Sequence, residues 1–169
     1  ILGTAAQNLE KAGADFVLIC TNTLHKVAPE ISAMIQIPLF HIAEATSLEL
    51  RANNIEKVAL LGTKYTMEED FYKKILIDRG IDVIIPQESD REILNDIIFK
   101  ELCLGIHTEK GKREYLRVID ALAENGAQGV IFGCTEIGLL ISADDSSLPV
   151  FDTALIHARQ AALLALKGE

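Results

Sequence analysis

The chain has 169 residues, of which 49% are apolar and none is tryptophan, and its formal net charge at pH 7 is -9. A chain of this length and composition can bury a substantial core and is typical of a globular α/β protein. The acidic balance argues against nucleic acid or an anionic membrane as a partner. No apolar run reaches the ~18 residues that a membrane span needs, and no signal peptide is visible, so we expect a cytoplasmic protein.

The three cysteines, Cys20, Cys103 and Cys134, lie far apart and form no Cys-x-x-Cys pair. An odd number of widely spaced cysteines gives neither a disulfide framework nor a zinc site. We therefore expect reduced thiols and no bound metal.

In chain order, helical periodicity alternates with short apolar runs, and glycine, asparagine or threonine separates them. Helices are predicted over residues 1–12, 21–34, 43–52, 68–79, 89–104, 113–124 and 153–166. A helical turn is predicted after Cys134, up to about residue 141. Strands are predicted over residues 15–20, 37–42, 57–62, 81–85, 129–132 and 148–151. This alternation predicts βαβ units and mostly parallel sheets.

Two parts of the chain repeat each other. Residues 13–21 lie over residues 126–134, with the glycine, alanine and valine identical and the apolar strand in register. Further on, residues 37–41 resemble residues 148–152 in the same order. Two matches in the same order favour an internal duplication.

The duplication predicts two pseudo-symmetric α/β lobes with a site in the cleft between them. We expect residues 1–53 and 147–169 to form lobe one and residues 54–146 to form lobe two. The alignment of the repeats pairs Cys134 with Thr21, not with Cys20. Small ligands bind at the carboxyl ends of parallel strands, so the loops after the strands at Thr21–Thr23, Gly62–Thr66 and Cys134–Glu136 are expected to line this cleft.

Three short motifs then resemble the aspartate/glutamate racemase family, the cofactor-independent amino-acid racemases. They are Thr21-Asn22-Thr23-Leu24-His25, Leu60-Leu61-Gly62-Thr63 and Gly133-Cys134-Thr135-Glu136. The resemblance covers nearly the whole chain. It implies two lobes with the substrate between them, one cysteine from each lobe beside the substrate Cα, no cofactor, and a homodimer.

The sequence departs from the family pattern in two places. Thr21 stands where the family has its first cysteine, and Cys20 lies one residue early, where its side chain is expected to point into the core. The chain also lacks the family's N-terminal strand and helix, with their glycine-rich loop, and begins at Ile1. We therefore expect the natural start to be missing.

The resemblance implies a racemase of acidic amino acids, aspartate or glutamate. Racemisation needs a general acid/base on each face of the Cα. Cys134 is expected to abstract the proton of one enantiomer, because helix N-termini and hydrogen bonds can lower a thiol pKa. Thr21, relaying a proton from water or from His25, or water held at Thr21, would serve the opposite face, so L and D substrates should react unequally.

The remaining site residues would hold the substrate. Hydroxyl and backbone N–H groups of Asn22, Thr23, Thr63 and Thr135 would stabilise the charge that develops at the α-carboxylate. Glu136 would support the same site.

Other functions stay open. A related decarboxylase needs no base on the second face, which suits a single cysteine, and a maleate-type cis–trans isomerase of a dicarboxylate is a further reaction of the same superfamily. A non-catalytic binding protein or an inactive fragment is the alternative outside enzymes.

Overall fold

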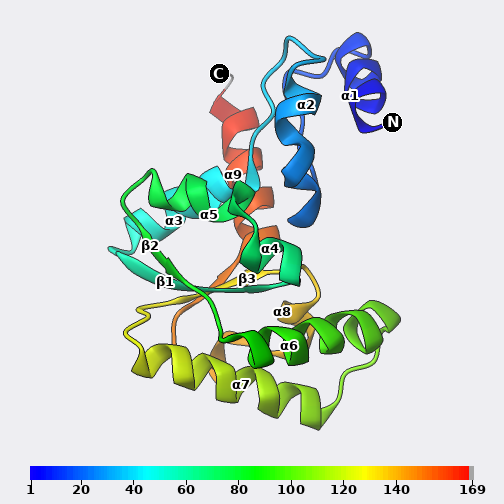
Figure 1. The fold of residues 1–169 in the computed structure, drawn as a ribbon. Coiled ribbons are helices and arrows are strands. Elements are labelled where there is room, and N and C mark those ends of the chain that lie inside the picture. Colours follow the sequence, from blue (N-terminus) through cyan, green and yellow to red (C-terminus); the bar gives the residue numbers. More distant parts are fainter. Residues whose placement is uncertain (168–169) are drawn as a thin grey trace.

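The computed structural model describes residues 1–167, and its centre is a four-stranded parallel sheet (Figure 1). The strand order is β2-β1-β3-β4, and every neighbouring pair is parallel. The strands are β1 (Lys57–Gly62), β2 (Asp82–Ile84), β3 (Val130–Gly133) and β4 (Val150–Asp152). The predicted α/β fold with a mostly parallel sheet is confirmed.

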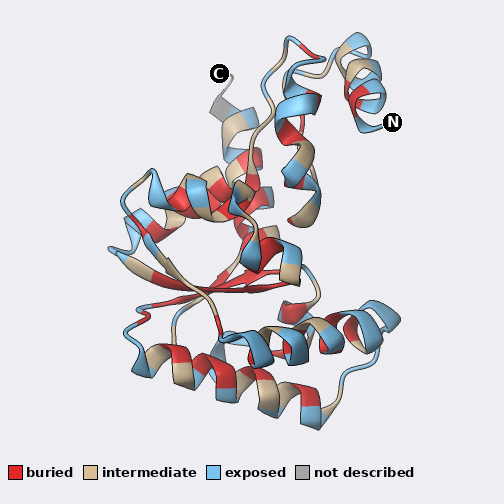
Figure 2. Cartoon of the chain, viewed as in Figure 1, coloured by how far each residue is buried: buried red, intermediate tan, exposed pale blue. Residues whose placement is uncertain are grey.

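The two central strands are buried on both faces, as their continuous apolar sequences require. Side chains alternate across the sheet: Ala59 and Leu61 of β1 join one core, while Val58 and Leu60 join the other. Five of the six β1 residues are buried, and so is all of β3. Figure 2 shows this layer as the most buried part of the molecule.

Helices cover both faces of the sheet (Figure 1). One face packs against α6 (Glu88–Lys100) and α7 (Glu109–Glu124). The other packs against α3 (Ile42–Ala52), α5 (Asp70–Ile77) and α9 (Thr153–Lys167). The shorter elements are α1 (Leu2–Lys11), η1 (Thr23–Val27), α2 (Ala28–Ser32), α4 (Lys64–Glu68), η2 (Leu102–Leu104), α8 (Ile137–Leu140) and η3 (Ala143–Asp145).

The first 41 residues are less regular than predicted. The strands expected over 15–20 and 37–42 reduce to one parallel bridge between Val17 and Leu39. A small separate core of Ala6, Val17, Ile31 and Ile35 holds this part together. The helix expected over 21–34 divides into η1 and α2.

Two helix boundaries also differ from prediction. The helix expected over 68–79 is divided between α4 and α5, because Glu69 has an extended backbone with ψ of 159°. The helix expected over 89–104 begins one residue earlier, at Glu88 with Gln87 as its N-cap, and α6 ends at Lys100. The proposed division into lobes at residues 53 and 146 stays a prediction.

Within residues 1–167, no helix is both long and apolar enough to cross a membrane.

Candidate active site

The three loops predicted to carry the site meet at one cavity of about 280 Å³. The first loop precedes η1, the second joins β1 to α4, and the third joins β3 to α8. The cavity is lined by Thr21, Asn22, Thr23, Thr63, Tyr65, Ile98, Phe99, Cys103, Gly133, Cys134, Thr135 and Glu136. All seven predicted site residues are among them, so the structure brings together every side chain that the motifs suggested. Their chemical roles remain predictions.

Glycines at the ends of β1 and β3 let these two loops start side by side. Gly62 pairs with Gly133 in the register of the strands. A Cβ on Gly133 would lie 2.7 Å from the carbonyl oxygen of Leu61, and one on Gly62 would lie 2.9 Å from the carbonyl oxygen of Gly133. Larger residues would push the strands apart, and Cys134 would move with them.

A triangle of threonine hydroxyls joins the first two loops. The Thr23 hydroxyl lies 3.2 Å from that of Thr63 and 3.3 Å from that of Thr66, and the latter two are 3.2 Å apart. Thr63 also caps α4 by accepting from the backbone N–H of Thr66. Thr66, to which the sequence motifs assign no role, is fully buried and fixes the hydroxyls of its neighbours.

Asn22 lines the cavity and carries a buried acceptor without a hydrogen-bond partner. Its side chain is 2% exposed, and Nδ2 donates to the Thr153 hydroxyl over 2.9 Å. That hydroxyl donates in turn to the carbonyl oxygen of Phe132 over 2.8 Å, which fixes the orientation of the amide. The Asn22 Oδ1 consequently has no hydrogen-bond partner among the residues described. A buried acceptor of this kind is costly unless a ligand donor satisfies it.

Cys134 is coupled to a carboxylate. Its thiol donates to Glu136 Oε2 over 2.9 Å, and the Thr135 hydroxyl donates to the same oxygen over 2.8 Å. Burial, followed by the hydrogen bond to Glu136, raises the pKa of Cys134 to about 12. Burial also works to raise the pKa of Glu136, but the hydrogen bonds from Cys134 and Thr135 outweigh it and hold that pKa below its usual value.

This finding differs from the expectation of a more acidic thiol. The helix that follows Cys134 has only four residues, so its dipole is too small to offset burial and a neighbouring anion. At neutral pH, Cys134 is therefore a protonated thiol beside an ionised Glu136.

His25 positions the first loop. It is almost fully buried, and its Nε2 accepts from the backbone N–H of Ile42 over 3.2 Å. Nδ1 must then carry the proton, which it donates to the carbonyl oxygen of Thr21 over 2.7 Å. Both ring nitrogens are committed to the backbone, so His25 ties Thr21 to the start of α3 and has no free nitrogen for a proton relay.

Three histidines gather behind this loop. The ring centroid of His25 lies 4.3 Å from that of His41 and 5.9 Å from that of His157. Burial is the main cause that lowers the pKa of His25 to about 4 and that of His41 to about 3. The cluster is uncharged at neutral pH.

Sequence reasoning missed one wall of the cavity. Cys103, whose place between two leucines of a predicted helix favours the core, is exposed and lines the cavity. Ile98, Phe99 and Tyr65 lie on the same cavity. No local signal marks this wall, because an aromatic residue such as Phe99 beside the apolar stripe of a helix is typical of core packing. Cys20, also expected in the core, is exposed as well, because the strand that was to bury it is a single bridge.

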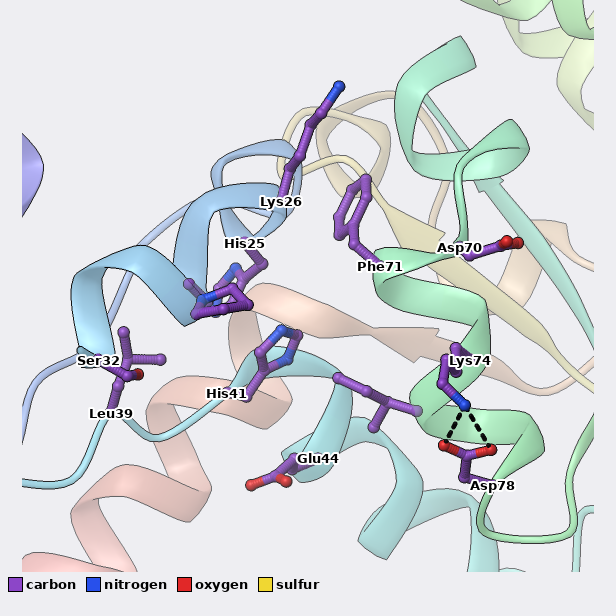
Figure 3. A pocket seen from close by; sticks show the side chains of 13 residues that line it. His25, Lys26, Ser32, Leu39, His41, Glu44, Asp70, Phe71, Lys74 and Asp78 are labelled. Atoms are coloured by element: carbon purple, nitrogen blue, oxygen red, sulfur yellow. Dashed lines mark hydrogen bonds and ion pairs between the residues drawn. The ribbon is translucent and has the colours of Figure 1, made fainter.

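A larger cavity of about 460 Å³ lies behind the histidines, between η1–α2 and α3–α5. Figure 3 shows His25 and His41 on one side of it and Phe71 and Lys74 on the other, with Lys74 paired to Asp78. His25 is its only lining residue from the three motifs. We assign the chemistry to the smaller cavity, because the thiol, the carboxylate and the hydroxyls line that one. Among residues 1–167, no group of three histidine, cysteine or acidic side chains could hold a metal ion.

Comparisons with known proteins show the family to which the chain is similar. The family model for Asp/Glu/hydantoin racemases matches residues 1–161. A Yersinia pestis protein of known structure, assigned to the Asp/Glu racemases, is 52% identical and superposes with a TM-score of 0.93, over 98% of this chain and 72% of that one. An aspartate racemase homologue from Pyrococcus horikoshii OT3 is 40% identical with a TM-score of 0.87, over 96% and 72%.

One curated relative is a racemase of a different printed specificity. The broad specificity amino-acid racemase RacX of Bacillus subtilis (strain 168) is 26% identical over 154 residues. That match covers 91% of this chain but only 66% of RacX. The family model covers well over half of the chain, and the match to the Yersinia pestis protein is extensive. The chain therefore belongs to the Asp/Glu/hydantoin racemase family.

Proposed function

We propose that this chain carries the active site of a cofactor-independent amino-acid racemase, an isomerase in which Cys134 exchanges the Cα proton. The observation that carries the proposal is the Cys134 thiol, hydrogen-bonded over 2.9 Å to the Glu136 carboxylate, in a cavity that Thr21 also lines. A thiol held beside a carboxylate has an acid form and a route to its base form. Those are the two states that proton exchange at carbon requires.

Cys134 starts in its acid form in this scheme, and it acts as an acid on a carbanion formed by proton removal on the opposite face. With a pKa near 12, it is protonated before the substrate binds, and it can return a proton to the carbanion. To act as a base, it passes its proton along the existing hydrogen bond to Glu136. The transfer moves the negative charge from the Glu136 carboxylate to the sulfur, and a substrate ammonium group bound nearer to the sulfur favours it. The pKa that disfavours ionisation also makes the thiolate, once formed, a strong base.

Thr21 serves the opposite face of the substrate. A threonine hydroxyl is too weak a base to act unaided, and both nitrogens of His25 are occupied by the backbone. Water held at the Thr21 hydroxyl is therefore the proton carrier on this face. It donates a proton to the carbanion that the Cys134 thiolate forms, and the hydroxide left behind takes up a proton from solvent; in the reverse direction hydroxide held there removes the Cα proton. Two faces with different carriers should exchange protons with L and D substrates at unequal rates.

The polar groups of the cavity hold the common part of an amino acid. Asn22 lines the cavity, and a small movement of its side chain would bring the unpartnered Oδ1 to the α-ammonium group as a hydrogen-bond acceptor. The hydroxyls of Thr23, Thr63 and Thr135 are suited to the α-carboxylate and to the charge that builds on it.

Substrate and assembly are extensions of this proposal. The family resemblance implies aspartate and glutamate, and the named relatives include an aspartate racemase homologue and a broad specificity racemase. A cytoplasmic homodimer is the corresponding proposal for location and assembly. Light scattering of the purified chain tests the dimer.

The proposal is tested by following Cα proton exchange in heavy water by NMR. The parent chain should incorporate deuterium into an amino acid, and Cys134→Ala should lose that exchange while keeping the same circular dichroism spectrum. Exchange at the parent's rate in Cys134→Ala would refute the proposal. Carbon dioxide release from a malonate would instead indicate a decarboxylase, and ligand binding without any exchange would indicate a binding protein.

A further inference from the structure

We propose that this cavity takes α-amino acids with uncharged, largely apolar side chains in preference to aspartate and glutamate. This inference rests on the proposed racemase function and specifies its substrate class. The observation that carries it is the division of the cavity into a polar side and an apolar side.

The apolar side comes from elements outside the three motifs. Tyr65 belongs to α4, Ile98 and Phe99 to α6, and Cys103 to η2. Ile98 is 1% exposed and forms a fixed floor, whereas Phe99 and Tyr65 are 50% and 55% exposed despite their large apolar surfaces. Large aromatic groups left open beside a polar site are typical of ligand contacts. A substrate side chain that covers them would remove apolar surface from water.

The charges around the cavity also favour a substrate with an uncharged side chain. The ionised Glu136 lies among the lining residues, and no lysine or arginine of the described chain lines the cavity. The two lysines nearest these loops do not line the cavity and are paired with other carboxylates. Lys26, whose Nζ lies 6.0 Å from the centroid of the Tyr65 ring, pairs with Glu69 over 2.8 Å, and Lys64 approaches Glu92 at 3.5 Å. Neither of those glutamates lines the cavity.

An acidic side chain would consequently be poorly accommodated here. Its carboxylate would leave water, meet the apolar wall and lie in the same small cavity as Glu136, without a cation to compensate. A leucine or methionine side chain carries no charge to desolvate and would cover the apolar wall. The polar loops would hold the α-ammonium and α-carboxylate groups equally well in both cases, so the wall decides the preference.

The preference is measured by the same exchange assay with a panel of substrates. For the parent chain, kcat/KM for deuterium exchange should be at least about tenfold higher for leucine and methionine than for aspartate and glutamate. Equal or faster exchange of the acidic pair would overturn this inference and leave the proposed racemase function intact. No exchange with any amino acid would overturn both.

A positive charge introduced into the apolar wall of the cavity gives a second test of the substrate preference. Phe99→Arg should shift the kcat/KM ratio toward glutamate by about tenfold or more, because it supplies the missing cation at a half-exposed position. Phe99→Leu should leave the preference for apolar side chains in place. Leu104→Arg is the matched control: Leu104 is 67% exposed, lies next to Cys103 and does not line the cavity. The same ratio in Phe99→Arg and Leu104→Arg would show that the wall does not contact the substrate side chain.

Discussion

Replacing Glu136 by glutamine should make the thiol of Cys134 more acidic. The thiol donates to this carboxylate over 2.9 Å, and burial together with the carboxylate holds its pKa at about 12, against an ordinary value of 9.0. Glutamine keeps the shape of the side chain and an accepting oxygen, but it removes the charge that opposes ionisation of the sulfur. Burial is the larger cause and persists in the variant, so the pKa should fall only part of the way.

The expected change in the alkylation rate of Cys134 follows from its pKa in the parent and its lower pKa in the Glu136→Gln variant. A thiol with a pKa of about 12 is ionised in roughly one molecule in 10⁵ at pH 7. Loss of an adjacent charge lowers a pKa by roughly one to two. Each unit raises the thiolate fraction about tenfold and lowers its nucleophilicity about threefold. Alkylation of Cys134 in Glu136→Gln should therefore be about three to ten times faster than in the parent.

The assay is iodoacetamide labelling across neutral to alkaline pH, read for each cysteine by peptide mass spectrometry. Exposed Cys20 is an internal reference in the same molecule, because it lies outside the Glu136 cluster. Glu92→Gln removes an equal charge from a residue that does not line the cavity and should leave Cys134 unchanged. An unchanged or slower labelling rate for Cys134 in Glu136→Gln, relative to Cys20, would refute the coupling.

Two further predictions concern stability. The fold favours the neutral form of His25, whose pKa is lowered to about 4. Its contribution of ~3 kcal/mol is therefore fully present above pH 6.5 and should be lost as the pH falls from about 6.5 to about 4, as urea unfolding at stepped pH would show. A His25→Asn variant that kept the full acid sensitivity would contradict this. Tyr72 and Tyr115 are both fully buried, but only the Tyr72 hydroxyl has a partner, at 3.0 Å. Tyr72→Phe should therefore cost ~1 kcal/mol in urea unfolding, and Tyr115→Phe about 0 kcal/mol or less; equal costs would contradict the pairing.

The polar half of the site can be located from the sequence. Gly62 and Gly133 each end an apolar run, and the loops that follow meet because parallel strands place their carboxyl ends at one edge. Chemistry-bearing residues in these loops are thus assigned to one cavity by the strand pattern alone. The internal repeat adds the pairing of Cys134 with Thr21, and the structure places both on that cavity.

The apolar half cannot be found in the same way. Ile98, Phe99 and Cys103 come from a helix and a 3-10 turn whose pattern indicates only a packed face, and nothing local shows that part of this face borders a ligand cavity. The thiol pKa is also beyond sequence reasoning, because burial, its largest cause, depends on how distant elements pack. The strand expected at Cys20 is shortened because it pairs at only one point.

The most direct test of the account compares deuterium exchange into the two enantiomers of one substrate in three chains. The parent should exchange L and D forms at unequal rates, Cys134→Ala should lose exchange by about 100-fold or more, and Thr21→Cys should bring the two rates closer together. Cys134→Ala exchanging both enantiomers at the parent's rates would contradict the central claim that this thiol moves the Cα proton.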